Sequence, residues 1–144
     1  MSLAMTKTER EAFLAGLHVG VVSVSRADEG PLLAPIWYIY EDDIVWFSTG
    51  AKSVKGLLMN LGTRISMVVQ TEVAPYQYVC VEGRIIARET ANIDRDVRPM
   101  AIRYLGEAVG TTYADNSTSG GNVLIKMRPE KWLTVDYNKQ FETN

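Results

Sequence analysis

Turn residues recur at short intervals along this chain, and they constrain its fold more than any other feature. Gly, Pro, Asp and Glu cluster at residues 26–31, 41–43 and 74–75, between runs rich in β-branched and aromatic residues. The runs are 19–24, 32–40, 44–47, 65–70, 78–87, 123–127 and 132–137. Short runs between such turns are typical of strands joined by hairpins. The sequence therefore predicts six or seven strands in an antiparallel barrel, Greek-key or meander, rather than a parallel sheet.

Some of these runs carry further signals. Pro35 lies inside the second run, which places that strand at a sheet edge or a bulge. Residues 65–70 are almost continuously apolar, which favours a strand buried on both faces. Gly83 interrupts the alternating run 78–87 and indicates a bulge or a close backbone approach.

Three segments have the period of a helix instead. Thr8 and Glu11 have the spacing of a capping box, with Gly16 or Gly20 as the stop. An apolar stripe over residues 54–61 predicts a second helix that ends before Gly62. Residues 92–105 predict a third helix, in which Pro99 either introduces a kink or begins a second piece. The fold class is thus α+β.

The whole chain, residues 1–144, is interpreted as one domain. Residues 1–5 are interpreted as a tag or a disordered start, and residues 138–144 as a tail.

Composition excludes several function classes. The formal charge is −2, so no electrostatic footprint for nucleic acid is present. No apolar run has the ~20 residues that cross a bilayer, and no secretory signal pattern occurs, so we expect a cytoplasmic protein without membrane contact. One histidine and one cysteine do not suffice for a Cys/His zinc site, and no metal site is predicted. We therefore expect the chemistry to come from a bound molecule.

Residues 44–61, IVWFSTGAKSVKGLLMNL, contain the strongest candidate site. A strand ends in hydroxyls and a glycine, and two lysines, Lys52 and Lys55, precede or open a helix. Such a junction can bind an anion, because helix N-termini present unpaired N–H groups and lysines add full charges. The alternative is that Ser53 only caps the helix and the lysines are solvated surface. The residue types alone leave both interpretations open.

The order of these segments resembles the split β-barrel flavoproteins, the pyridoxamine 5′-phosphate oxidase-like family and its deazaflavin-dependent branch. The resemblance extends over roughly residues 10–140 and is carried by an ordered set of segments. These are LAPIWY at 33–38, WFSTG at 46–50, KSVK at 52–55, GTRISMV at 62–68, YQYVCVEGR at 76–84, PEKW at 129–132 and DYNK at 136–139.

The resemblance implies a homodimer with a flavin-type cofactor in a groove between the subunits. It implies that Ser48 or Thr49, Lys52, Ser53 and Lys55 hold the cofactor's phosphate. The strand segment Pro35, Ile36 and Trp37 would run along the ring system. Gln77, Tyr78 and Trp132 would approach the cofactor from the partner chain, with a place in the interface core as the alternative for Trp132.

Two departures argue against pyridoxamine phosphate as the substrate. The oxidases of that vitamin carry a C-terminal Arg-x-His segment, which is missing, and an arginine where this chain has Leu32. The implied function is an oxidoreductase that uses FMN, or alternatively the deazaflavin coenzyme F-420, and passes hydride to a small organic acceptor. A carrier or sensor that binds a flavin or another planar ligand without catalysis is the alternative. No residue is assigned a catalytic role.

Overall fold

The computed structural model describes residues 2–118 and 120–142. In chain order its elements are α1 (Lys7–Ala15), β1 (Gly20–Val24), β2 (Leu32–Ile36), β3 (Ile39–Glu41), β4 (Ile44–Gly50), α2 (Val54–Leu58), β5 (Arg64–Gln70), β6 (Gln77–Thr90), a π-helix (Ile93–Val97), α3 (Arg98–Leu105), α4 (Glu107–Asp115), β7 (Asn122–Asp136) and a 3₁₀ helix (Tyr137–Phe141). No helix in these ranges is long and apolar enough to cross a membrane.

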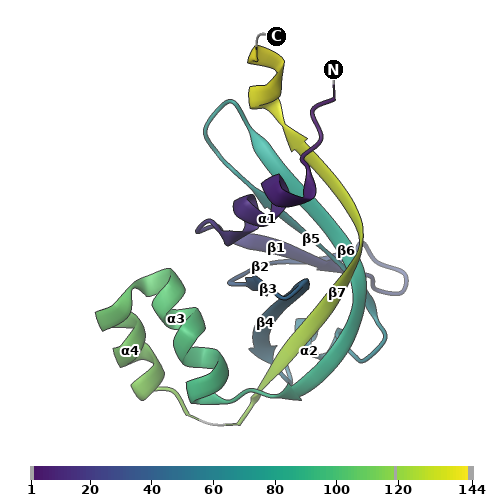
Figure 1. Ribbon diagram of the computed structural model, residues 1–144. Helices are drawn as coiled ribbons and strands as arrows, with labels where there is room; N and C mark the ends of the chain where they lie inside the picture. Colours follow the sequence, from purple (N-terminus) through teal and green to yellow (C-terminus); the bar gives the residue numbers. More distant parts are fainter. Residues whose placement is uncertain (1, 119, 143–144) are drawn as a thin grey trace.

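The strands form one seven-stranded sheet in the order β2-β1-β5-β6-β7-β4-β3, with every pairing antiparallel. The predicted antiparallel sheet is thus confirmed. The order differs from a simple meander, because β5 pairs with β1 and β7 pairs with β4. Figure 1 shows β6 and β7 curving together along the molecule, with α1 over one part of the sheet and the α3–α4 pair at a separate flank.

The predicted strand 32–40 is wrong in one respect, because it breaks into β2 and β3 at Trp37 and Tyr38. The backbone N–H of Tyr38 donates to the Tyr104 hydroxyl of α3 (3.1 Å). The Tyr38 side chain is fully buried, and its hydroxyl donates to the Leu14 carbonyl at 2.8 Å. These contacts turn the chain from one sheet edge to the other. As Pro35 predicts, β2 is an edge strand.

Strand β7 runs without interruption through Pro129, where the sequence predicts two strands. Pro129 pairs with Gly83 of β6 at a register shift. Because the ladder is irregular there, the missing N–H of the proline is tolerated. The predicted irregularity at Gly83 is confirmed, and a Cβ at this glycine would collide with the Arg128 carbonyl oxygen.

Strand β5 is buried on one face only, so the prediction of two buried faces is wrong. Ile65, Met67 and Val69 are buried, whereas Ser66 is exposed and Val68 is half-buried. The buried three join the main core under α1, which also contains Phe47 of β4.

The capping box of helix α1 lies two residues earlier in the chain than predicted. Thr6 and Glu9 form the box, and Gly16 ends the helix. Both threonines fit the capping pattern, but Met5 is only 7% exposed and its N–H donates to the Thr134 hydroxyl at 2.8 Å. Residues just before the helix therefore belong to the packed fold and fix where the helix starts.

Residues 92–115 contain one helix more than the sequence predicts. A π-helix is followed by α3, with Pro99 in its first turn, so Pro99 begins a second piece. Helix α4 is unpredicted, and it follows directly after Gly106, whose φ is +86°. Gly110 of α4 lies against the backbone of Ile102, and a Cβ there would come within 2.5 Å of the Ile102 Cα. This close approach makes α3 and α4 a tight hairpin (Figure 1).

A second, smaller core joins α3 to the sheet. Trp46 of β4, Met100 of α3 and Leu124 of β7 are its buried members. The Tyr104 hydroxyl strengthens the contact, because it donates to the His18 carbonyl at 2.6 Å. The helical hairpin is therefore held in a fixed position beside the ends of β2 and β4.

Candidate functional site

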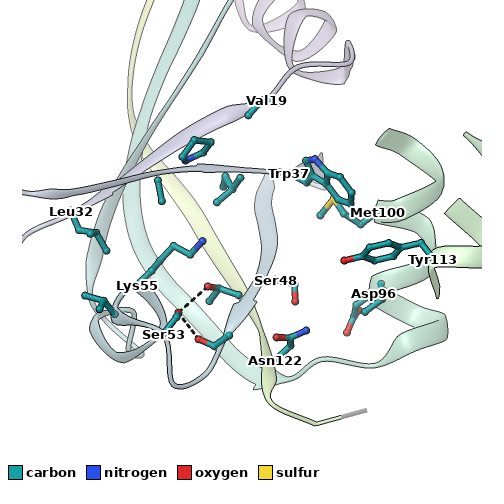
Figure 2. A pocket seen from close by; sticks show the side chains of 17 residues that line it. Val19, Leu32, Trp37, Ser48, Ser53, Lys55, Asp96, Met100, Tyr113 and Asn122 are labelled. Carbon is teal, nitrogen blue, oxygen red and sulfur yellow. Dashed lines mark hydrogen bonds between the residues drawn. The ribbon is translucent and has the colours of Figure 1, made fainter. Parts of the chain in front are cut away.

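A cavity of about 880 Å³ lies between β2, the end of β4, α2 and the α3–α4 hairpin. It contains seven of the eleven residues that the resemblance implies, namely Pro35, Ile36, Trp37, Ser48, Thr49, Ser53 and Lys55. Figure 2 shows four of them around this space, namely Trp37 just after β2, Ser48 on β4, Ser53 in the turn before α2 and Lys55 on α2. Segments that are separated in the sequence thus meet in one site.

The other four implied residues lie outside this cavity. Lys52 is exposed in the turn before α2. Gln77 lines a second cavity of about 690 Å³, together with His18 and Gln70. Tyr78 is half-buried on β6. Within one chain, the structure does not bring these residues to the first cavity.

Trp132 packs inside its own chain. Its ring makes an edge contact with Tyr40, with centroids 6.0 Å apart, and the Arg10 guanidinium lies 4.3 Å above it. It is partly buried against the main core.

The β4–α2 junction is built around Ser53 and Gly56. The Ser53 hydroxyl donates to the Gly50 carbonyl (2.7 Å) and accepts from the Gly56 N–H (3.0 Å), so Ser53 is the helix cap. Gly56 is required by packing, because a Cβ there would overlap the Gly50 carbonyl oxygen. With its proton already donated, the Ser53 hydroxyl is available to a ligand only as an acceptor.

Helix α2 is shorter than predicted. It has five residues and ends at Leu58, so Gly62 is not its stop. Three of the four residues in the predicted apolar stripe are exposed rather than buried: Val54 (61%), Leu57 (62%) and Leu61 (69%).

Within the part of the chain that the structure describes, Lys55 is the one ammonium group that lines the cavity, and it points into the cavity from α2 (Figure 2). Its pKa is lowered, because burial disfavours the charged form. No ion pair to Lys55 occurs among the described residues. Ser48, Thr49 and Asn122 add polar side chains to the same region. This end of the cavity can therefore bind an anion.

The opposite wall comes from the helical hairpin. Met100 of α3 and Tyr113 of α4 face the cavity beside Trp37 (Figure 2). Trp37 stacks on Tyr104 with centroids 5.1 Å apart and planes 5° apart. Tyr113 is tilted by 56° against Trp37, at 6.0 Å. The wall is aromatic and mainly apolar.

Asp96 is the only carboxylate lining the cavity in the described chain, and it is fully engaged. It is 4% exposed and accepts hydrogen bonds from the Arg95 Nε (2.8 Å), the Arg95 Nη2 (2.7 Å) and the Asn92 N–H (2.9 Å). Burial alone would raise the pKa of Asp96, but the Arg95 and Asn92 hydrogen bonds outweigh it and lower the pKa. Asp96 is therefore a structural anion rather than a free acid or base.

Sequence reasoning missed ten lining residues. They are Val19, Leu32, Ala34, Gly50, Val54, Asp96, Val97, Met100, Tyr113 and Asn122. Three of them, Ala34, Gly50 and Val54, are adjacent to a predicted residue along the chain. The group from α3, α4 and the π-helix gives no local signal, because its place at the cavity depends on how the hairpin folds back.

Comparisons with solved structures show the fold. A conserved hypothetical protein from Mycobacterium tuberculosis is 19% identical, with a TM-score of 0.79, over 99% of this chain and 91% of the other. A protein described as an F420 reductase is 20% identical, with a TM-score of 0.68, over 85% and 94% of the two chains. A FAD-binding protein from Mesorhizobium loti is 19% identical, with a TM-score of 0.60, over 91% and 94%. These likenesses support the split-barrel fold.

No curated protein matches this sequence. Residues 6–136 match the family model of pyridoxamine 5′-phosphate oxidase. Because this match spans nearly the whole chain and the sheet agrees with it, the protein belongs to the pyridoxamine 5′-phosphate oxidase family.

Proposed function

We propose that this protein is an oxidoreductase that binds a flavin-type cofactor in the 880 Å³ cavity and passes hydride to a small organic acceptor. FMN is the first candidate cofactor, and the deazaflavin coenzyme F-420 is the alternative. The observation that carries the proposal is Lys55, a half-buried ammonium without an ion-pair partner in the described chain, directed into a cavity of ligand size.

The cavity's two ends suit the two parts of such a cofactor. Lys55, Ser48 and Thr49 offer a cation and hydroxyl donors to a phosphate. Pro35, Ile36 and Trp37 offer an apolar strand to a planar ring, and one edge of β2 has no strand neighbour in the described sheet. Structural neighbours described as an F420 reductase and as FAD-binding proteins favour the same class of ligand.

The bound cofactor would supply the redox chemistry, since flavins and deazaflavins accept and donate hydride. The chain's own residues have three tasks. Lys55 neutralises the phosphate, the β2 segment orients the ring, and the apolar wall of Trp37 and Met100 excludes water. Because Asp96 is held by Arg95, we assign it no proton transfer.

The proposal includes a two-fold homodimer. Gln77, Tyr78 and Trp132 lie away from the cavity of their own chain, and the family resemblance places such positions near the partner's cofactor. The exposed residues Leu57, on α2, and Leu61, shortly after it, provide apolar surface that a partner would cover. Each dimer would hold two equivalent sites.

Direct titration tests the proposal. Cofactor-free protein is titrated separately with FMN and with F-420, and binding is followed by the cofactor's absorption and fluorescence. We expect saturable binding of one of them, followed by turnover when the reduced complex meets an organic acceptor. Binding of neither would refute the proposal, and binding without turnover of any acceptor would favour the carrier or sensor.

A further inference from the structure

The cavity is larger than its anion-binding end, and the α3–α4 end has a different chemistry. Trp37 is fixed there, because it stacks on Tyr104 at 5.1 Å and the Tyr104 hydroxyl donates to the His18 carbonyl at 2.6 Å. Tyr113 and Met100 complete the wall. An aromatic face flanked by a tilted ring and a thioether favours another flat ring beside it.

The Tyr113 hydroxyl gives this wall one polar feature. The side chain extends from α4 into the cavity, on the side opposite Lys55 (Figure 2). Tyr113 is 50% exposed, and its hydroxyl makes no hydrogen bond within the part of the chain that the structure describes. A phenol in this setting can donate to a carbonyl oxygen.

Charge at this end selects against anions. The nearest charged lining group is the Asp96 carboxylate, whose oxygens are occupied by Arg95 and Asn92. Lys55 enters from the far side (Figure 2). An anionic ligand would therefore find no unpaired cation at this end of the described chain, because the Arg95 guanidinium already pairs with Asp96, whereas a neutral ring meets apolar and hydroxyl groups.

We propose that the α3–α4 end is the acceptor subsite, which binds a neutral planar ring carrying a carbonyl, and that Tyr113 is a specificity-determining residue. The ring lies along the wall of Trp37 and Met100, and its carbonyl oxygen accepts a hydrogen bond from the Tyr113 hydroxyl. The inference rests on the proposed function, because the subsite is meaningful only beside a cofactor that reduces its occupant.

Binding of menadione, a neutral naphthoquinone, tests the subsite. Its affinity is measured by calorimetry for wild-type protein and for Tyr113→Phe, both with and without the oxidised cofactor. We expect Tyr113→Phe to weaken menadione binding roughly threefold to tenfold, the loss of one hydrogen bond, while cofactor affinity is unchanged. In turnover, the KM for menadione should rise more than kcat falls.

Two controls separate this effect from a general loss of structure. Tyr137→Phe makes the same chemical change in the C-terminal 3₁₀ helix, outside both cavities, and should leave menadione affinity unchanged. A naphthoquinone sulfonate of similar ring size should bind more weakly than menadione.

The outcomes also separate the inference from the proposed function. Equal menadione affinity for wild type and Tyr113→Phe, or tighter binding of the sulfonate, would overturn the subsite while leaving the cofactor site intact. Failure of both FMN and F-420 to bind would overturn the proposed function and, with it, the acceptor role of this wall.

Discussion

Lys55 connects the structure of the cavity to a measurable pH dependence. Burial lowers its pKa in the cofactor-free protein, and a bound phosphate would raise that pKa again. At pH values between these two pKa values, Lys55 takes up a proton when the cofactor binds. Cofactor affinity should therefore be constant where the ammonium is charged in both states, and should fall as pH rises through the lowered pKa.

This fall is measured by titrating the cofactor at pH values above ~7, where a phosphate monoester already carries nearly its full charge. In Lys55→Met the cofactor affinity should not change over this pH range, since no titrating group remains at this position. If cofactor affinity fell equally with pH in both proteins, the titrating group would be one other than Lys55.

At the scale of elements, the short helix α2 depends on a residue from another strand. The Arg88 Nη1 of β6 donates to the Gly56 carbonyl and to the Met59 carbonyl (2.7 Å), so it binds the C-terminal end of the helix that carries Lys55. A cation at this end also interacts favourably with the unpaired carbonyl groups.

Replacement of Arg88 by methionine should lower the free energy of unfolding by about 1–3 kcal/mol, because buried carbonyl groups lose charged donors. It should also weaken cofactor binding by displacing α2. Chemical denaturation measures the first effect. Arg84→Met is the matched control, since Arg84 lies on the same strand with 58% of its side chain exposed, and exposed ion pairs contribute only ~0–1 kcal/mol. Equal losses in both variants would contradict this role of Arg88.

The elements show where sequence reasoning succeeds and where it fails. The hairpin between β3 and β4 is predictable because Asp42 and Asp43 form its two-residue turn, with φ of 52° and 60°. The continuity of β7 is not predictable from the sequence, because the sheet accommodates Pro129 only through its pairing with Gly83 in a different strand. The capping box is ambiguous for the same reason, since Thr6 is selected by the tertiary contacts of Met5.

The residues of the candidate site likewise fall into those that the local sequence predicts and those that it does not. The side chains near the end of β4 carry a local signal, in which hydroxyls, a glycine and lysines follow a strand. Tyr113 and Met100 carry none, because they reach the cavity only after Gly106 and Gly110 have folded α4 onto α3. Lys52 and Lys55 look equivalent in sequence, but only Lys55 faces the cavity.

At the scale of the whole molecule, the proposed dimer should depend on the exposed apolar stripe of α2. Leu57 is 62% exposed, and a carboxylate at this position would resist burial in an interface. Leu57→Glu should shift the protein from a two-chain to a one-chain mass in sedimentation, with weaker cofactor binding. Val109→Glu, at a residue 60% exposed on α4, should leave the mass unchanged. A wild-type protein that sediments as one chain would contradict the shared site.

The most direct test of the account compares two lysines three residues apart. Wild type, Lys55→Met and Lys52→Met are titrated with FMN and F-420 at one pH near neutrality. Loss of a charge-assisted contact should weaken binding to Lys55→Met about 10- to 100-fold, whereas Lys52→Met should stay close to wild type. Because burial lowers the pKa of Lys55, cofactor-free Lys55→Met should also be at least as stable as wild type. Equal cofactor affinity in all three proteins would contradict the claim that Lys55 makes this cavity an anion site.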